Sequence, residues 1–241
     1  MPQNWKTTVR RALTSRAVLP CLITICLNFV AFYGARAVYR LEDAAGILRF
    51  HDLSIPAIDG YFEANVRFFR WFIIIYIFYF IFWFAGYWIN AGVEKSVSHP
   101  FFAATSIGMI TCAVIFILFP TAMEQVVIRE EEIETVFDRL ALLIYRSDEP
   151  NNLFPSIHCF TSYMIARYSA KSGRLPKGYK LFCIFACVAI FASTLFVRQH
   201  LFADLIGAAV LGELSILAER LTHAGRLFDK LDQFIRKENP A

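Results

Sequence analysis

Two short segments contain side chains whose types and spacing could do chemistry. In the first, NNLFPSIHC at 151–159, Pro155 and Ser156 come directly before Ile157 and His158. Proline suits the opening turn of a helix, and the free backbone N–H groups of such a turn attract an anion. The segment therefore predicts a phosphate-binding helix start with an imidazole beside it.

The second segment, STLFVRQHLFAD at 193–204, contains an imidazole and a carboxylate at helical spacing. His200 and Asp204 are four residues apart, so on a helix they share a face and lie within hydrogen-bonding reach. Such a carboxylate fixes the tautomer of the imidazole and leaves its other nitrogen free to act as a nucleophile.

The composition indicates an integral membrane protein. Of 241 residues, 57% are hydrophobic and 18% are charged, with a mean hydropathy of +0.49. Much of this surplus lies in uncharged runs long enough to cross about 30 Å of hydrocarbon, which excludes a soluble globule or a disordered chain. The net charge of +4 gives no support for nucleic-acid binding. The six cysteines show no disulfide or zinc-ribbon spacing, so neither metal nor cofactor is expected.

The hydrophobic runs predict an all-α fold, a six-span bundle that forms one membrane domain over 1–241. The fourth expected span is the most polar, and the sixth contains Asp204 and Glu213. Ionisable residues inside spans are costly in lipid and are candidates for function. Residues 219–241 are expected to form an amphipathic cytoplasmic tail. The expected spans are about 17–39, 68–90, 101–123, 153–170, 181–198 and 201–218.

The charge distribution predicts the orientation. With six spans, basic clusters at 6–16, 171–180 and 220–237 fall on one side, which the positive-inside rule assigns to the cytoplasm. Residues 124–150 hold eight acidic residues, as expected of an outer loop. Both histidine segments then face the outer side of a bacterial inner or plasma membrane.

Several features have alternative interpretations. A basic start, an apolar run and Ala35-Arg36-Ala37 would also suit a cleaved secretory signal. Amphipathic helices at 133–144 and after the last span could lie along the interface, or the second could pack on the inner end of the bundle. Glu213 is interpreted as a packing residue because the sequence suggests no partner for it, and His51 lacks a motif around it.

The two segments together resemble the signatures of the type 2 phosphatidic acid phosphatase superfamily. Pro155-Ser156-Ile157-His158 is similar to its PSGH signature, and Ser193, His200 and Asp204 match its later SRxxxxxHxxxD signature. The six-span pattern with both signatures on the outer side is similar as well. The signatures themselves are short, and the span pattern extends the resemblance to nearly all of the chain.

The resemblance implies a role for each matching residue. His200 would attack phosphorus to form a phosphohistidine, Asp204 would orient it, and His158 would protonate the departing alkoxide. Ser156 and neighbouring backbone N–H groups would hold phosphate oxygens, and Ser193 and Thr194 would also contact the substrate. No metal would be needed. A positioned general acid is typically worth about 10²- to 10⁴-fold in rate.

The chain departs from the family at its phosphate-binding cations. The arginine that normally follows Ser193 is Thr194, and the earlier KxxxxxxRP signature is absent. Arg198, two residues before His200, is the obvious substitute for the first. Arg129 and Arg139 in the outer loop are candidates for the second, and no spacing selects between them.

The sequence therefore predicts a membrane phosphatase that hydrolyses a lipid phosphate monoester or diphosphate through a phosphohistidine. One alternative is a lipid phosphotransferase that passes a phosphoryl-containing head group to an alcohol. Another is a transporter or channel whose intramembrane His, Asp and Arg form an ion path. The expected partners are the lipid phosphate and the bilayer, without nucleic acid, and the oligomeric state is left open.

The predicted topology can be tested by cysteine labelling in intact cells. A single cysteine next to Ser172, at Gly173 in a cysteine-depleted background, should resist an impermeant reagent applied from outside, because the 171–180 segment is expected in the cytoplasm. A cysteine in the 124–150 loop should be labelled. Outside labelling at position 173 would overturn the orientation and with it the shared outer site.

Overall fold

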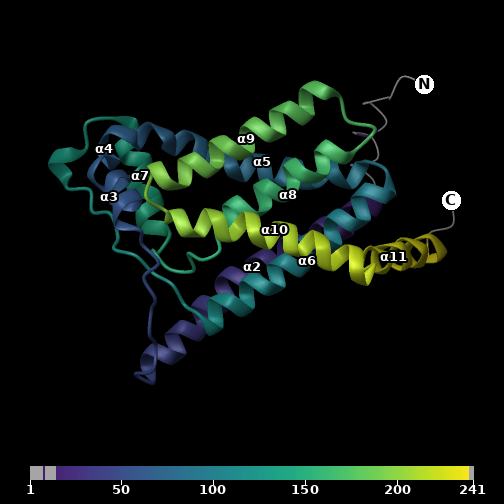
Figure 1. Ribbon diagram of the computed structural model, residues 1–241, viewed down its shortest axis with the longest axis horizontal. Coiled ribbons are helices and arrows are strands. Elements are labelled where there is room, and N and C mark those ends of the chain that lie inside the picture. Colours follow the sequence, from purple (N-terminus) through teal and green to yellow (C-terminus); the bar gives the residue numbers. More distant parts are fainter. Residues whose placement is uncertain (1–7, 9–14, 239–241) are drawn as a thin grey trace.

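The computed structural model describes residue 8 and residues 15–238, and this part of the chain is helical without strands (Figure 1). The predicted all-α class is confirmed. Lys6, Arg10 and Arg11 of the expected N-terminal basic cluster lie outside the described residues. The long helices are α2 (Ser15–Ala44), α5 (Ile73–Gly92), α6 (Lys95–Leu118), α8 (Ile157–Lys171), α9 (Lys177–Phe196) and α10 (Phe202–Thr222).

Four helical segments are long and apolar enough to cross a membrane: Val18–Ala44, Val66–Gly92, Lys95–Leu118 and Lys177–Phe196. They correspond to the expected first, second, third and fifth spans. The other two helices differ in kind. α8 has only 15 residues, about 22 Å at 1.5 Å per residue. α10 has 21 residues but contains several charged side chains.

α8 is polar because other helices surround it. It packs against α9, α10, α5 and α6, and Thr161 and Ser162 are fully buried. The hydroxyls of Thr161 and Tyr79 on α5 are 3.0 Å apart. α6 approaches α8 so closely that a methyl group at Gly108 would lie 2.0 Å from the ring of Phe160. Any side chain at position 108 would therefore require the buried ring of Phe160 to shift. A helix covered by protein in this way needs no apolar surface of its own.

Prolines set two of the helix ends. α6 ends at Leu118, earlier than the expected 123, because Pro120 has no N–H to continue the helix and restricts the residue before it. α8 begins at Ile157 with Ser156 as its N-cap, so Pro155 lies just before the helix rather than in its opening turn.

Short helices gather at one end of the bundle, at the left of Figure 1. They are α3 (Pro56–Ala64), α4 (Val66–Phe69), the 3₁₀ turns Arg70–Phe72 and Glu130–Glu132, and α7 (Val136–Ser147). The predicted amphipathic segment 133–144 is helical from Val136. The apolar face of α7 packs on Ile73 and Tyr76 of α5 and on Val197 beyond α9. α7 therefore covers the bundle end at which α8 and α10 begin.

The other end is closed by α11 (Gly225–Glu238), which packs against α6 and α2. The ring of Phe228 lies 6.0 Å from that of Phe102. His99 Nδ1 is 2.7 Å from Asp229 Oδ1, and Lys95 pairs with Asp232. Of the two interpretations of this segment, packing on the bundle end is the one observed; residues 239–241 lie outside the described part.

Glu213 has a partner that the sequence did not suggest. Its carboxylate accepts hydrogen bonds from Arg167 Nε at 2.7 Å and Nη2 at 3.1 Å, and from the hydroxyl of Tyr163. The pair links α8 to α10. This agrees with a packing role, but the contact is a fork-shaped ion pair rather than a simple apolar contact.

A buried ion pair holds the segment that carries α7. The side chain of Arg70 is 5% exposed and donates to Asp138 Oδ1 at 2.9 Å and to Glu132 Oε2 at 3.1 Å. Thr135 and Asp138 form a capping box at the start of α7. Burial raises the pKa of Asp138, but hydrogen bonds from Thr135 and Arg70 outweigh it and lower the pKa to about 2.

Replacing this carboxylate should destabilise the protein. We expect Asp138→Asn to lower the free energy of unfolding by about 3 kcal/mol at neutral pH, because Arg70 then loses its buried charge partner and keeps only the more exposed Glu132. The folded-state pKa lies below the ordinary value of 3.8, so the stabilisation is complete above that value and declines as the pH falls from about 4 towards 2. Denaturant unfolding in detergent over this pH range measures both effects.

Glu134→Gln is the matched control for Asp138→Asn. It removes a carboxylate from the exposed Arg67–Glu134 pair, whose side chains are 58% and 66% exposed. An exposed pair typically contributes less than about 1 kcal/mol. Equal effects of the two substitutions would contradict the assigned importance of the buried pair.

Candidate active site

The start of α8 is tied to the start of α10. The Ser156 hydroxyl accepts a hydrogen bond from the Cys159 amide at 3.3 Å, and the Ser156 amide donates to the Asp204 carbonyl at 3.2 Å. As in any helix, the amides of the first turn lack intrahelical acceptors. With Cys159 capped by Ser156, those of Ile157 and His158 are the ones available to an anion.

The turn between α9 and α10 reverses the chain within five residues and presents His200. The amides of Gln199 and His200 both donate to the carbonyl of Thr194, at 2.9 and 3.2 Å. Arg198 takes up the left-handed conformation, with φ of 49°, which is uncommon for a residue other than glycine. Tyr145 of α7 fastens the turn from outside by donating its hydroxyl to the Val197 carbonyl at 2.8 Å.

His200 and Asp204 form the predicted contact, although His200 lies in the turn before α10 and not on the same helix as Asp204. Nδ1 of His200 lies 3.2 Å from Oδ2 of Asp204, which also accepts from the Leu201 amide at 2.8 Å. A carboxylate can only accept, so Nδ1 is the donor and Nε2 keeps its lone pair. Asp204 is fully buried, and its Oδ1 has no hydrogen-bond partner among the described residues.

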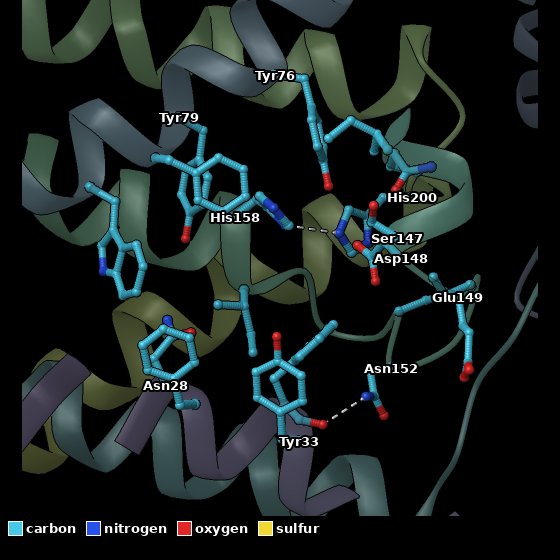
Figure 2. A pocket seen from close by; sticks show the side chains of 18 of the residues that line it. Asn28, Tyr33, Tyr76, Tyr79, Ser147, Asp148, Glu149, Asn152, His158 and His200 are labelled. Atoms are coloured by element: carbon cyan, nitrogen blue, oxygen red, sulfur yellow. Dashed lines mark hydrogen bonds between the residues drawn. The ribbon is translucent and has the colours of Figure 1, made fainter. Parts of the chain in front are cut away.

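The second histidine faces the free nitrogen of the first. Nδ1 of His158 is 3.4 Å from Nε2 of His200 (Figure 2). The rings of Tyr79 and Tyr76 flank His158, with centroids 4.3 and 4.9 Å away. Segments distant in the sequence therefore bring both predicted imidazoles and the carboxylate together.

A pocket of about 300 Å³ opens beside the histidines. Aromatic side chains of α2 and α5 form much of its wall, and four of them, at positions 29, 33, 80 and 84, are 41% to 59% exposed on the outer surface of these helices. The pocket thus connects the histidine pair with the surface between α2 and α5. Its lining comprises Asn28, Phe29, Phe32, Tyr33, Tyr76, Tyr79, Phe80, Trp83, Phe84, Ile144, Ser147, Asp148, Glu149, Asn151, Asn152, Leu153, Ile157, His158, Gln199 and His200.

Arg198 is buried close to the site with donors left over. It is 5% exposed, and its Nη2 lies 3.2 Å from Glu63 Oε2. Its Nε and Nη1 are buried and have no hydrogen-bond partner among the described residues. A buried guanidinium with two unsatisfied donors is a strong candidate to bind an anion, because unmade hydrogen bonds in the interior are costly.

The remaining predicted substrate-binding residues are placed less favourably. Ser156, Ser193 and Thr194 are fully buried and do not line the pocket. The hydroxyls of Ser193 and Thr194 donate to carbonyls of their own helix at 2.8 Å. Arg129 and Arg139 are exposed and also lie outside the lining. Neither of these two arginines is brought to the histidine pair.

The structure adds polar residues that motif reasoning did not find. Asp148 and Glu149 line the pocket on the side that holds His200 (Figure 2). Arg36 of α2 donates to Asp148 Oδ1 at 2.6 Å and to the Glu149 carbonyl at 3.1 Å. Burial raises the pKa of Asp148, although Arg36 opposes this. The only feature of the sequence that could have indicated Asp148 and Glu149 is their position just before the first histidine segment.

His51, the other histidine considered, lies at the same end but outside the lining of this pocket. Its ring stacks on Phe119 at 4.1 Å, and its backbone pairs with Pro120 and Ala122. These contacts join the loop after α2 to the loop after α6. They describe a residue that holds two loops together.

Comparison of the chain with protein-family models, curated proteins and solved structures finds no match. Function therefore has to be inferred from the geometry of the site.

Proposed function

We propose that the chain is a membrane enzyme that cleaves a lipid phosphate ester through a phosphohistidine on His200. The observation that carries the proposal is the alignment of three groups in one place. Asp204 holds Nδ1 of His200, Nε2 of His200 faces His158, and both imidazoles open into the aromatic pocket. A nucleophile, its orienting carboxylate and a second proton-transfer group are the parts that covalent catalysis requires.

The reaction proceeds in two steps. Nε2 of His200 attacks phosphorus, the bond from phosphorus to the lipid oxygen breaks, and His158 donates a proton to that oxygen. Water then attacks the phosphohistidine while His158 accepts its proton, which releases phosphate and restores His200. In the resting site, Nδ1 of His158 lies 3.4 Å from Nε2 of His200. Phosphorus must occupy nearly this position, about 3 to 3.5 Å from Nε2, for attack to occur. Substrate binding therefore requires His158 to move aside.

Charge on the transferring phosphoryl group is matched by fixed donors. The buried Nε and Nη1 of Arg198 lack partners, and the first-turn amides of α8 point towards its N-terminal end, where the helix dipole favours an anion. No cluster of three or more metal-ligating side chains is found in the described chain. The proposed reaction relies on these donors and on His158 for electrostatic stabilisation.

The aromatic pocket favours a lipid over a soluble phosphate. Its wall is formed by rings of α2 and α5, two of the helices apolar enough to cross a membrane. A lipid entering between these two helices would keep its hydrocarbon in contact with apolar surface while its phosphate reaches His200. We place the site on the outer side, in a six-helix bundle in which protein-covered α8 and charged α10 complete the domain.

Hydrolysis of a monoester or diphosphate is the first form of this proposal, and transfer to an alcohol is the second. Both use the same phosphohistidine and differ in what attacks it. A transporter fits less well, because the polar groups gather at the starts of α8 and α10 rather than midway along them.

Substitution of the two histidines should separate their roles. We expect His200→Ala to abolish turnover of a lipid phosphate, since no nucleophile remains. His158→Ala should lose about 10²-fold or more on the same substrate but recover on p-nitrophenyl phosphate, whose leaving group needs no proton. His51→Ala, from the same end of the bundle, should keep its activity. Equal losses by His158→Ala on both substrates would contradict the general-acid assignment.

Arg198 should carry the phosphate-binding charge. Arg198→Ala is expected to lower kcat/KM on the order of 10²-fold or more, and Arg198→Lys should recover only part, since an ammonium cannot make two parallel hydrogen bonds. Arg129→Ala and Arg139→Ala serve as controls because both arginines are exposed, whereas Arg198 is buried two residues before His200. Near-normal turnover by Arg198→Ala would overturn the assignment and return attention to these two.

A further inference from the structure

The pocket that contains the histidine pair has an unusual charge balance for a phosphate site. Its lining includes the carboxylates Asp148 and Glu149, while no lysine or arginine of the described residues lines it. Arg198, the cation assigned to the phosphate, is not a lining residue. A phosphate entering beside two carboxylates meets like charge, which is unfavourable unless some cation lies between them.

Arg36 does not supply the missing charge. Its guanidinium donates to Asp148, to the Glu149 carbonyl and, at 3.3 Å, to Asn151 Oδ1, and it lies 4.2 Å from the ring centre of Phe32. These contacts hold it in place. One guanidinium against two carboxylates leaves one negative charge over at the polar side of the pocket.

Asp148 keeps an oxygen for a ligand. Within the described chain its carboxylate has one hydrogen bond, from Arg36 to Oδ1. Oδ2 of Asp148 has no hydrogen-bond partner among these residues, and it is not a fully buried atom. Glu149 is exposed, and its Oε2 accepts from Asn151 at 2.9 Å. Asp148 is thus the better placed of the two to receive a cation inside the pocket.

The aromatic wall supports the same chemistry. Tyr33 lies across the pocket from the histidines, and Tyr76 and Tyr79 lie beside them (Figure 2). The faces of such rings attract cations, and ammonium groups are bound by cages of aromatic side chains. Rings together with an adjacent carboxylate suit an alkylammonium group better than a neutral or anionic one.

We propose that the substrate is a lipid phosphate that carries an ammonium group near phosphorus, with this group bound by Asp148 and the neighbouring aromatic rings. The inference rests on the proposed function, because it assigns the phosphate to His200 and Arg198. The ammonium can belong to the lipid backbone or to a head group on the far side of a phosphodiester. In both cases the positive charge offsets the excess carboxylate while phosphorus reaches His200.

Two matched substrate pairs test the inference and distinguish an ammonium group on the lipid backbone from one on the head group. The first is a long-chain 2-aminoalkyl phosphate and its N-acetyl derivative, and the second is phosphatidylethanolamine and its N-acetyl derivative. Each pair differs in the charge on nitrogen. With purified full-length protein in detergent, kcat/KM should be at least about tenfold higher for the free amine in one pair. The pair that shows this preference identifies whether the recognised ammonium group belongs to the lipid backbone or to the head group.

Variants separate recognition from anchoring of the loop. Asp148→Asn should bring the amine preference to within about threefold of unity. Arg36→Gln removes the anchor but keeps the carboxylate, so the preference should persist even if overall activity falls. Glu131→Gln, an exposed outer-loop carboxylate outside the pocket, should leave the preference unchanged. If Asp148→Asn does not fold, Glu149→Gln provides the second carboxylate variant, with a smaller but definite loss of preference expected.

The outcomes distinguish this inference from the proposed function. Equal turnover of both members of each pair, with His200→Ala inactive, would overturn amine recognition and leave the enzyme assignment standing. Equal loss of preference in Asp148→Asn and Arg36→Gln would show that the ion pair only anchors the loop. No turnover of any of the four lipids, and no phosphoenzyme with any, would overturn the proposed function and this inference together.

Discussion

Asp204 is the group on which the site depends. Its carboxylate holds Nδ1 of His200 and the Leu201 amide, and its backbone carbonyl accepts from the amide of Ser156. One buried residue thus fixes the tautomer of the proposed nucleophile, the opening turn of α10 and the position of the N-cap of α8. Because the carboxylate is fully buried, its charge is compensated only by these donors. Burying this charge is costly, and the hydrogen bonds from His200 and from the Leu201 amide offset that cost.

The elements around Asp204 hold the starts of α8 and α10 in place relative to each other. α7 lies over the turn between α9 and α10, to which Tyr145 is bonded, and the buried pair of Arg70 and Asp138 holds α7 in turn. On the other side, Arg36 fixes the loop that leads into α8. The site is therefore built where several chain segments end, and it is held by hydrogen bonds between them rather than by one continuous element.

The sequence predicted which side chains meet at the candidate site better than it predicted their surroundings. The contact of His200 with Asp204 is local, because it joins the residue before the N-cap of α10 to the first turn of that helix. The proximity of His158 required only that two helix starts meet at one end of a bundle. The role of Arg36 could not be predicted in this way, since its partner Asp148 lies 112 positions away and neither residue belongs to a motif. Ser193 and Thr194 matched a signature by position, but their hydroxyls bond to α9 itself.

Hydropathy had a similar limit for the helices. It identifies α2, α5, α6 and α9, whose outer faces carry apolar side chains. It marks α8 only as the most polar of the expected spans, because surrounding helices supply the cover that apolar residues would otherwise provide. Charge pairing between Arg167 and Glu213 is likewise invisible to a hydropathy profile. These pairings depend on which helices are neighbours, and that information is contained in the tertiary contacts rather than in local composition.

The most direct test of the account is to locate the covalent intermediate. Purified protein would be mixed with a ³²P-labelled lipid phosphate, quenched within milliseconds under alkaline denaturing conditions, and digested for peptide mapping. Phosphohistidine is expected on the peptide that contains His200, with the label lost on acid treatment and absent from His200→Ala. Turnover that leaves no labelled peptide, or label on His158 instead, would contradict the assignment of His200 as the nucleophile.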